Sequence, residues 1–285
     1  MEWQEQDLIY GHAGELALEA TLYLPESRIE PGPVVIEVHG GAWSSGNRKA
    51  GKHYIRELAK AGIVVLSIDF RQGPDFKHPS ASADVACAVR YVRVQAENWG
   101  VGISSLGLIG SSSGGHLAML ASLKPEVAEH CTSIPVGVDG NPTAAVDWVI
   151  ALWPVSNPLA RYQYVLARLP EAEQTRPIFQ PDRLEQAHRG YYASLEDMEQ
   201  ASIQRILAAG EQQCLPNLFI VQPELDQNVP VFMSQTLKGA WEHAGGSVQY
   251  KLYEGVGHAF AHREGPQTAA CIEDMKHYIK EWRRS

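Results

Sequence analysis

The sequence predicts an α/β protein built on a mostly parallel, doubly wound sheet of about eight strands. Apolar runs of strand length alternate with stretches of helical pattern through most of the chain. The run at residues 34–38 is apolar at almost every position, which is typical of a strand covered on both faces in a parallel sheet. A second such run, at 106–110, leads through a turn of small residues directly into a helical stretch. Together these three observations indicate strands joined by helical crossovers.

The individual elements follow from the period of the apolar residues. Residues 16–24 alternate apolar and polar side chains, which predicts a half-buried strand near a sheet edge that ends at Pro25. Further expected strands lie at 34–38, 63–68, 106–110, 148–153, 218–221 and 248–253. Expected helices lie at 52–60, 82–98 and 230–244, and a last helix has Ile272, Met275, Ile279 and Trp282 on one face.

The stretch at about residues 156–214 breaks the alternation of strands and helices. It has a helical pattern, is mixed in polarity and is rich in Tyr, Gln and Glu. A connection this long within a compact domain usually has a function, so we expect a helical cap insertion over the site. Because no repeat, low-complexity tract or linker interrupts the chain, residues 1–285 are interpreted as one domain with this insertion.

Composition excludes several classes of function. The formal net charge of −9 opposes contact with phosphate groups, so we expect no nucleic-acid or membrane partner. No apolar run reaches the roughly 20 residues that cross a bilayer, and the first residues lack the pattern of a secretory signal. We therefore expect a cytoplasmic protein. The scattered cysteines lack C-x-x-C spacing and are expected to be free thiols: Cys87, Cys131, Cys214 and Cys271.

The turn at residues 110–114 carries a candidate nucleophile. The spacing Gly110-x-Ser112-x-Gly114 between a strand and a helix is typical of a nucleophile elbow, a sharp turn that exposes a serine hydroxyl in a strained conformation. Of three adjacent serines only Ser112 fits this register, because the frames centred on its neighbours lack the two glycines.

A serine nucleophile requires a base and a group that orients the base. In doubly wound hydrolases these follow in the order Ser, acid, His. Asp226 lies just beyond a buried strand, and His258 lies in a glycine-flanked turn after the next strand, so both are expected at the same sheet edge as Ser112. Glu224 remains a rival acid and His262 a rival base.

The loop that follows residue 38 is a candidate oxyanion hole. The amide of Ser113 can supply one donor, and the others should come from residues 39–42, where the glycines let the backbone approach the site. His39 is interpreted as a buried structural residue. Trp43 is open to two interpretations, as a core residue or as a wall of the acyl pocket, and is our candidate substrate-binding residue.

Four segments in this order carry a resemblance to a known family. They are His39-Gly40-Gly41-Ala42-Trp43, the run Gly110-Ser111-Ser112-Ser113-Gly114-Gly115-His116-Leu117, the Asp226 turn ending in Val229-Pro230, and Gly257-His258-Ala259-Phe260. The chain resembles the α/β-hydrolase superfamily, and within it the hormone-sensitive-lipase and carboxylesterase-like branch that includes kynurenine formamidases and feruloyl or acetyl-xylan esterases.

The resemblance implies the α/β-hydrolase fold and a complete site. It implies Ser112 as nucleophile, His258 as base, Asp226 as its partner, and the amides of Gly41, Ala42 and Ser113 as the oxyanion hole. Many members have a third glycine where this chain has Ala42.

The expected function is hydrolysis of a small-molecule ester through an acyl-enzyme, without metal or cofactor. The same residues could cleave an amide or formamide instead, and a non-catalytic binding protein on the same scaffold is a third hypothesis. Glu254, His258 and His262 recur every four residues, but the glycines between them disfavour the helix that would align them as metal ligands. The expected partner is a small-molecule ester or amide, and the sequence allows a homodimer.

Overall fold

The computed structural model describes residues 2–28 and 30–282. Among these residues, nine strands form one sheet in the order β6-β1-β2-β4-β3-β5-β7-β8-β9. The strands are β1 (Trp3–Ala13), β2 (Leu16–Pro25), β3 (Gly32–Val38), β4 (Val64–Ile68), β5 (Ile103–Ser111), β6 (Ile134–Pro135), β7 (Trp148–Leu152), β8 (Asn217–Pro223) and β9 (Val248–Tyr253). The run from β4 to β9 is parallel, whereas β6, β1 and β2 pair antiparallel. The predicted mostly parallel sheet is confirmed.

The strands that sequence patterning missed lie at the antiparallel end of the sheet. β1 begins with a polar, largely exposed stretch, so its side chains carry little alternating apolar signal. β6 has only two residues. Because β1 pairs along the whole of β2, the strand expected near the edge is the third from it.

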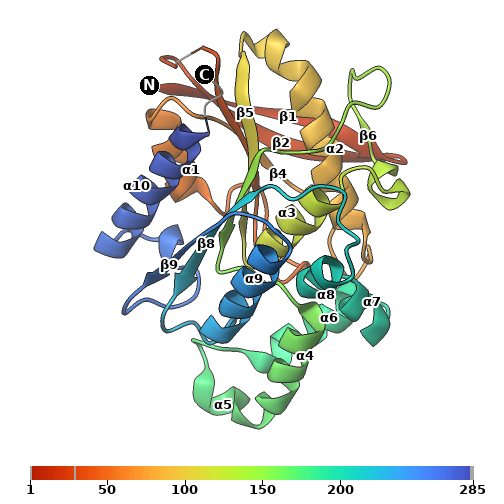
Figure 1. Ribbon diagram of the computed structural model, residues 1–285, viewed down its shortest axis with the longest axis vertical. Coiled ribbons are helices and arrows are strands. Elements are labelled where there is room, and N and C mark those ends of the chain that lie inside the picture. The colour runs from red at the N-terminus through yellow and green to blue at the C-terminus, as the bar shows by residue number, and fades with distance from the viewer. Residues whose placement is uncertain (1, 29, 283–285) are drawn as a thin grey trace.

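Helices cover both faces of the sheet, as Figure 1 shows. They are α1 (Lys52–Lys60), α2 (Ser80–Gln95), α3 (Ser113–Leu123), α4 (Pro158–Ala167), α5 (Ala172–Thr175), α6 (Pro181–Tyr191), α7 (Leu195–Gln200), α8 (Ile203–Ala208), α9 (Val231–His243) and α10 (Pro266–Glu281). In β3, Val34 and Ile36 join the core beneath α2, α3 and α9, while Val35 joins the core beneath α1 and α10. This alternation explains why the strand is apolar on nearly every residue.

Two expected elements end earlier than their patterns indicate. The helix expected to reach residue 98 ends at Gln95 and continues as a 3₁₀ turn to Trp99, where Gly100 adopts a left-handed conformation with φ 65°. β7 ends at Leu152 because Trp153 turns out of the strand with φ 39°.

The segment between β7 and β8 holds α4 to α8, and we call residues 158–208 the inserted helices. They lie at the end of the sheet toward which β5 runs into α3 (Figure 1). Asn157 caps α4 by accepting a hydrogen bond from the Ala160 amide at 3.0 Å. The His116 ring on α3 contacts the Ala201 carbonyl oxygen at 2.8 Å through its Nε2 atom. The inserted helices are therefore packed against the helix that follows the Ser112 turn.

The described residues also test two expectations from composition. The four cysteines are free, with Cys87 and Cys271 buried, Cys214 half-buried and Cys131 exposed. Across residues 2–28 and 30–282, none of the helices combines the length and apolar character needed to span a membrane.

Candidate active site

Three side chains that are distant in the sequence meet above the carboxyl ends of the parallel strands. The His258 Nε2 atom lies 3.2 Å from the Ser112 Oγ atom, and its Nδ1 atom lies 2.7 Å from Asp226 Oδ2. The Asp226 side chain has no exposed surface, whereas that of His258 is 20% exposed. The imidazole thus contacts a hydroxyl on one flank and a carboxylate on the other, which is the geometry expected of a nucleophile, a base and an orienting acid.

The turn around Ser112 is sharp and strained. Ser112 adopts φ 54° and ψ −116° between the end of β5 and the first residue of α3, a conformation that costs a non-glycine residue about 1–3 kcal/mol. A Cβ atom at Gly110 would lie 2.3 Å from the Gly114 carbonyl oxygen, and one at Gly114 would lie 2.1 Å from the Val38 carbonyl oxygen. Both glycines are therefore required by backbone contact, which fixes the position of the serine.

The loop after β8 holds the acid. Asp226 Oδ1 accepts hydrogen bonds from the amides of Asn228 at 2.8 Å and Val229 at 2.9 Å, so Oδ2 remains for the histidine. Glu224, the rival acid, is exposed and accepts a hydrogen bond from the Gly255 amide at 2.8 Å. The structure brings Asp226, and not Glu224, to the histidine ring.

The turn after β9 holds the base. Ala259 adopts a left-handed conformation with φ 65°, which turns the chain directly after His258. The Trp153 ring meets the His258 ring edge-on, with centroids 6.1 Å apart. His262, the rival base, lines the same cavity, but burial and the neighbouring His258 lower its pKa to about 4. His262 is therefore neutral at neutral pH, and the histidine within hydrogen-bond distance of the Ser112 hydroxyl is His258.

The loop after β3 lies beside Ser112 and presents free amides. Gly41 has φ 121°, and a Cβ atom there would lie 1.8 Å from the Ser45 carbonyl oxygen, so only glycine fits. Ala42 is also left-handed, with φ 52°. Among the residues described, the amides of Gly41 and Ala42 donate to no other group, and the Ser113 amide is in the first turn of α3, where helix amides lack intrahelical acceptors.

Two residues at the ends of this loop, His39 and Trp43, are buried among other side chains. The His39 side chain is buried and stacks on Phe70 with ring centroids 4.3 Å apart. Trp43 has no exposed surface and packs parallel to Tyr191 of α6 at 5.7 Å. It does not line the cavity at Ser112. The structure thus places Trp43 in the core between the sheet and the inserted helices, where it cannot touch a substrate in this conformation.

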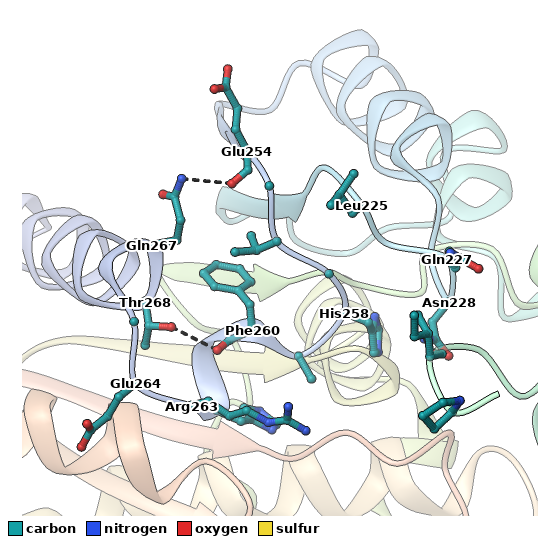
Figure 2. A pocket seen from close by; sticks show the side chains of 18 of the residues that line it. Leu225, Gln227, Asn228, Glu254, His258, Phe260, Arg263, Glu264, Gln267 and Thr268 are labelled. Atoms are coloured by element: carbon teal, nitrogen blue, oxygen red, sulfur yellow. Dashed lines mark hydrogen bonds between the residues drawn. The ribbon is translucent and has the colours of Figure 1, made fainter. Parts of the chain in front are cut away.

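The meeting point of these loops is a small cavity of about 260 Å³. On the sheet side it is lined by Ser112, His258 and the loop after β3 at residues 39–42, which we call the glycine loop. The inserted helices contribute Arg161 and Arg183 to the lining. A wider groove of about 1050 Å³ shares His258 and Arg183 with it and extends along the turn after β9, as Figure 2 shows. A substrate can therefore reach the Ser112 hydroxyl from this groove.

The spacing of Glu254, His258 and His262 does not build a metal site. The segment is a turn followed by a short 3₁₀ helix, and Figure 2 shows the Glu254 carboxylate pointing away from His258. In the described part of the chain no group of three or more His, Cys, Asp or Glu side chains could hold a metal ion.

Sequence patterning missed the contribution of the inserted helices to this cavity. Arg161 lies one helical turn into α4 and is 1% exposed, and Arg183 lies near the start of α6. In the sequence both look like solvated helix residues. The one local signal is Asn157-Pro158, which is typical of a helix N-terminus. It predicts where the helix begins but does not predict which of its faces lies at the site.

Comparison with solved structures defines the class of this fold. The chain matches a bacterial heroin esterase with a TM-score of 0.78 at 20% identity, over 100% of this chain and 86% of that one. It matches EstE1, a thermophilic carboxylesterase cloned from a metagenomic library, with a TM-score of 0.78 at 20% identity, over 99% of this chain and 90% of that one. The protein has the α/β-hydrolase fold, as the motifs predicted.

Sequence comparison then gives the family. The model of the BD-FAE family matches residues 21–241, and the chain belongs to this family. Esterase LipC of Mycobacterium tuberculosis is 26% identical over 258 residues, which is 90% of this chain and 60% of LipC. A probable isoprenylcysteine alpha-carbonyl methylesterase, ICME of Oryza sativa subsp. japonica, is 24% identical over 267 residues, 92% of this chain and 59% of the relative. The chain thus spans about three-fifths of the length of these curated relatives.

Proposed function

We propose that this protein is a carboxylesterase, a serine hydrolase that cleaves small-molecule carboxylic esters through an acyl-enzyme intermediate. The observation that carries the proposal is the position of the His258 ring, 3.2 Å from the Ser112 hydroxyl and 2.7 Å from the Asp226 carboxylate. The esterase names of the relatives support the same class of reaction.

In the acylation step, His258 Nε2 takes the proton of the Ser112 hydroxyl while Oγ attacks the ester carbonyl carbon. Asp226 accepts a hydrogen bond from the Nδ1 proton, which fixes the ring tautomer and stabilises the imidazolium that forms. The tetrahedral intermediate collapses as the imidazolium protonates the departing alkoxide, so an alcohol leaves and an acyl-serine remains. Water then attacks this acyl group while His258 takes one of its protons, the imidazolium returns that proton to the departing Ser112 Oγ atom, and the free acid is released.

The amides of Gly41, Ala42 and Ser113 form the proposed oxyanion hole. The free amides of the glycine loop and the first amide of α3 lie on the two chain segments that flank Ser112. Fixed N–H donors aimed at the developing oxyanion each contribute about 3–4 kcal/mol to lowering a barrier of this kind. Because these donors belong to the backbone, their position depends on the left-handed conformations of Gly41 and Ala42.

The size of the cavity favours a short acyl group. At about 260 Å³ it accommodates a few carbon atoms beside the carbonyl, and the wider groove leaves room for a larger leaving group.

A series of p-nitrophenyl esters with acyl chains of increasing length tests this proposal. We expect kcat/KM to be highest for short acyl chains and to decline as the chain outgrows the cavity. A fluorophosphonate probe should label the protein at Ser112, as mapped by peptide mass spectrometry. Folded protein that neither cleaves any ester of the series nor is labelled would refute the proposal and favour a non-catalytic binding protein.

A further inference from the structure

Arg161 is a buried cation with an unused donor in the wall of the catalytic cavity. Arg161 is 1% exposed, and its Nε atom donates to the Asn228 carbonyl oxygen at 3.0 Å. Its Nη1 atom is buried and has no partner among the described residues. A buried donor without an acceptor costs about 1–3 kcal/mol, so an acceptor group supplied by a ligand would stabilise this side chain.

The guanidinium keeps its charge in this setting. Burial lowers the pKa of Arg161 to about 10, against the opposing effect of the Asp226 carboxylate, so the side chain is protonated at neutral pH. No carboxylate of the described chain lies within 4.0 Å of it. Because the charge is buried and has no ion-pair partner, an anionic group from outside the chain would stabilise it.

A second guanidinium faces the same cavity from α6. The Arg183 Nη2 atom donates to the Ser45 Oγ atom at 2.9 Å, and this hydroxyl donates to the Gly41 carbonyl oxygen at 2.9 Å. Arg183 also has no carboxylate within 4.0 Å in the described chain. It lies where the small cavity meets the wider groove. Two cations therefore flank the path to Ser112.

The carboxylates of the wider groove do not neutralise this pair. Figure 2 shows the side chains of Glu254 and Glu264 pointing away from His258. The formal net charge of −9 describes the whole chain, whereas the lining of the cavity includes two guanidinium groups, one on the buried Arg161 and one on the exposed Arg183.

We propose that the natural substrate is an ester that carries a carboxylate group close to the scissile bond, and that Arg161 and Arg183 bind this carboxylate. The inference rests on the proposed function, because it names the substrate class of the same site. Guanidinium groups match carboxylates in shape and charge and form charge-assisted hydrogen bonds with them. The carboxylate could belong to the acyl group, as in a half-ester of a dicarboxylic acid, or to the alcohol, as in an ester of a hydroxy acid.

Two matched pairs of esters test the proposal and distinguish these sources. The acyl pair is p-nitrophenyl butyrate and mono-p-nitrophenyl succinate, and the alcohol pair is 2-acetoxyacetamide and 2-acetoxyacetate, each with a single ester bond. We expect kcat/KM to favour the anionic member of one pair by about ten-fold or more, the order of a hydrogen bond to a charged group. Equal kcat/KM values for the two members, or preference for the neutral member, in both pairs would overturn the proposal.

Variants separate recognition from structural support, since Arg161 also holds the Asn228 carbonyl. Arg161→Gln and Arg183→Gln should each lower the anionic-to-neutral ratio about ten-fold, chiefly through KM, and Arg161→Lys should recover part of it. Arg189→Gln removes the same charge from an exposed position on α6 and should leave the ratio unchanged. If Arg161→Gln and Arg183→Gln lower kcat/KM equally for the anionic and the neutral member of a pair, the two arginines support the structure and do not bind the carboxylate, which would overturn the proposal. If Arg161→Gln fails to fold, the exposed Arg183 decides the outcome.

Binding without turnover separates this inference from the proposed function. Monomethyl succinate should bind the Ser112→Ala variant in calorimetry, and the added Arg183→Gln substitution should weaken that binding about ten-fold, whereas methyl butyrate should be unaffected. Ester hydrolysis with no binding preference for the anion would refute the carboxylate site and leave the esterase intact. Anion binding by a protein that cleaves none of the four esters would refute the esterase and leave the anion site.

Discussion

The strand ends and the inserted helices both line the catalytic cavity, but they do so by different means. On the sheet side, Ser112, Asp226 and the glycine loop are held by backbone contacts that leave no room for adjustment, such as the 1.8 Å between a Cβ at Gly41 and the Ser45 carbonyl oxygen. The inserted helices reach the cavity through the long side chains of Arg161 and Arg183.

This difference indicates that the strand ends and the inserted helices contribute differently to activity. Proton transfer and oxyanion stabilisation require donors placed within a few tenths of an ångström, which a backbone turn fixed by a sheet can provide. Selection among substrates requires complementary charge and shape, which side chains on helices can supply and vary. Substitutions on the sheet side should therefore lower turnover for every ester, whereas those on the helical side should change the ranking of esters.

The largest expected effect comes from Ser112→Ala. Without the hydroxyl no acyl-enzyme forms, and kcat on a short-chain p-nitrophenyl ester should fall roughly 10⁴- to 10⁶-fold. Ser122→Ala is the matched control, because Ser122 is a buried serine of α3 whose hydroxyl bonds only to the Met119 carbonyl oxygen at 2.8 Å. Retention of more than a few per cent of turnover in Ser112→Ala, with Ser122→Ala active, would contradict the assignment.

The next effect comes from Asp226→Asn. An amide in place of the carboxylate can present an N–H to the ring and stabilise the wrong tautomer, so kcat should fall roughly 10³- to 10⁴-fold. Glu224→Gln changes the rival acid, which bonds to the Gly255 amide, and should retain nearly full activity. Steady-state kinetics on one ester compares the two variants, and the reverse ranking would assign Glu224 as the acid.

A smaller effect is expected in the glycine loop. Gly41→Ala must move the loop because its Cβ would collide with the Ser45 carbonyl, and kcat should fall roughly 10²- to 10³-fold through lost oxyanion donors. Ala42→Gly removes a side chain from a left-handed position, with φ 52°, and should retain activity within a few-fold. Comparable kcat values for wild type and Gly41→Ala would show that this loop does not hold the oxyanion.

The smallest effect concerns the packing of the inserted helices on the sheet. Burial lowers the pKa of His116 on α3 to about 4 and that of His188 on α6 to about 3, from an ordinary value of 6.5. Below about pH 6.5 the unfolded chain therefore binds more protons at these two histidines than the folded chain does. The free energy of unfolding consequently decreases as the pH falls from about 6.5 toward 4, and above pH 6.5 these groups no longer change it. Each histidine contributes up to about 1.4 kcal/mol per pH unit.

Thermal denaturation followed by tryptophan fluorescence between pH 4 and 7 checks this expectation. His188→Gln should flatten the decline of Tm toward acid, since glutamine binds no proton. His277→Gln alters an exposed histidine of α10 and should leave the slope unchanged. Identical slopes in all three proteins would mean that protonation of His188 is not coupled to unfolding.

Much of the sheet could be predicted from the sequence, because parallel strands buried on both faces leave continuous apolar runs. The run at 34–38 is an example, with Val34 and Val35 on opposite faces. β1 was missed because its exposed, polar residues carry no such signal, although it pairs along the whole of β2. Strand pairing through the backbone is invisible in the pattern of side chains.

Within the candidate site, local signals located three turns but could not choose between the roles of nearby residues. The glycine spacing identified Ser112, while Glu224 and His262 remained rivals to Asp226 and His258. In the structure, two backbone amides donate to the Asp226 carboxylate and orient it toward the His258 ring. The Glu224 carboxylate instead accepts a hydrogen bond from the Gly255 amide. For Trp43 the sequence allowed both a core and a substrate-binding interpretation, and its full burial places it in the core.

The sequence by itself determined the order of the buried strands and of the helices that follow them, the elbow at Ser112 and the glycines that the tight turns need, because these depend on neighbours a few residues apart. Only the tertiary structure decided which carboxylate meets His258, and that Arg161, with a buried and unpartnered donor, lies in the wall of the cavity. The reason is that helix faces and loop ends acquire their surroundings from segments more than 60 residues away, as with Arg161 and Asn228. Such contacts are set by packing, and no local pattern encodes them.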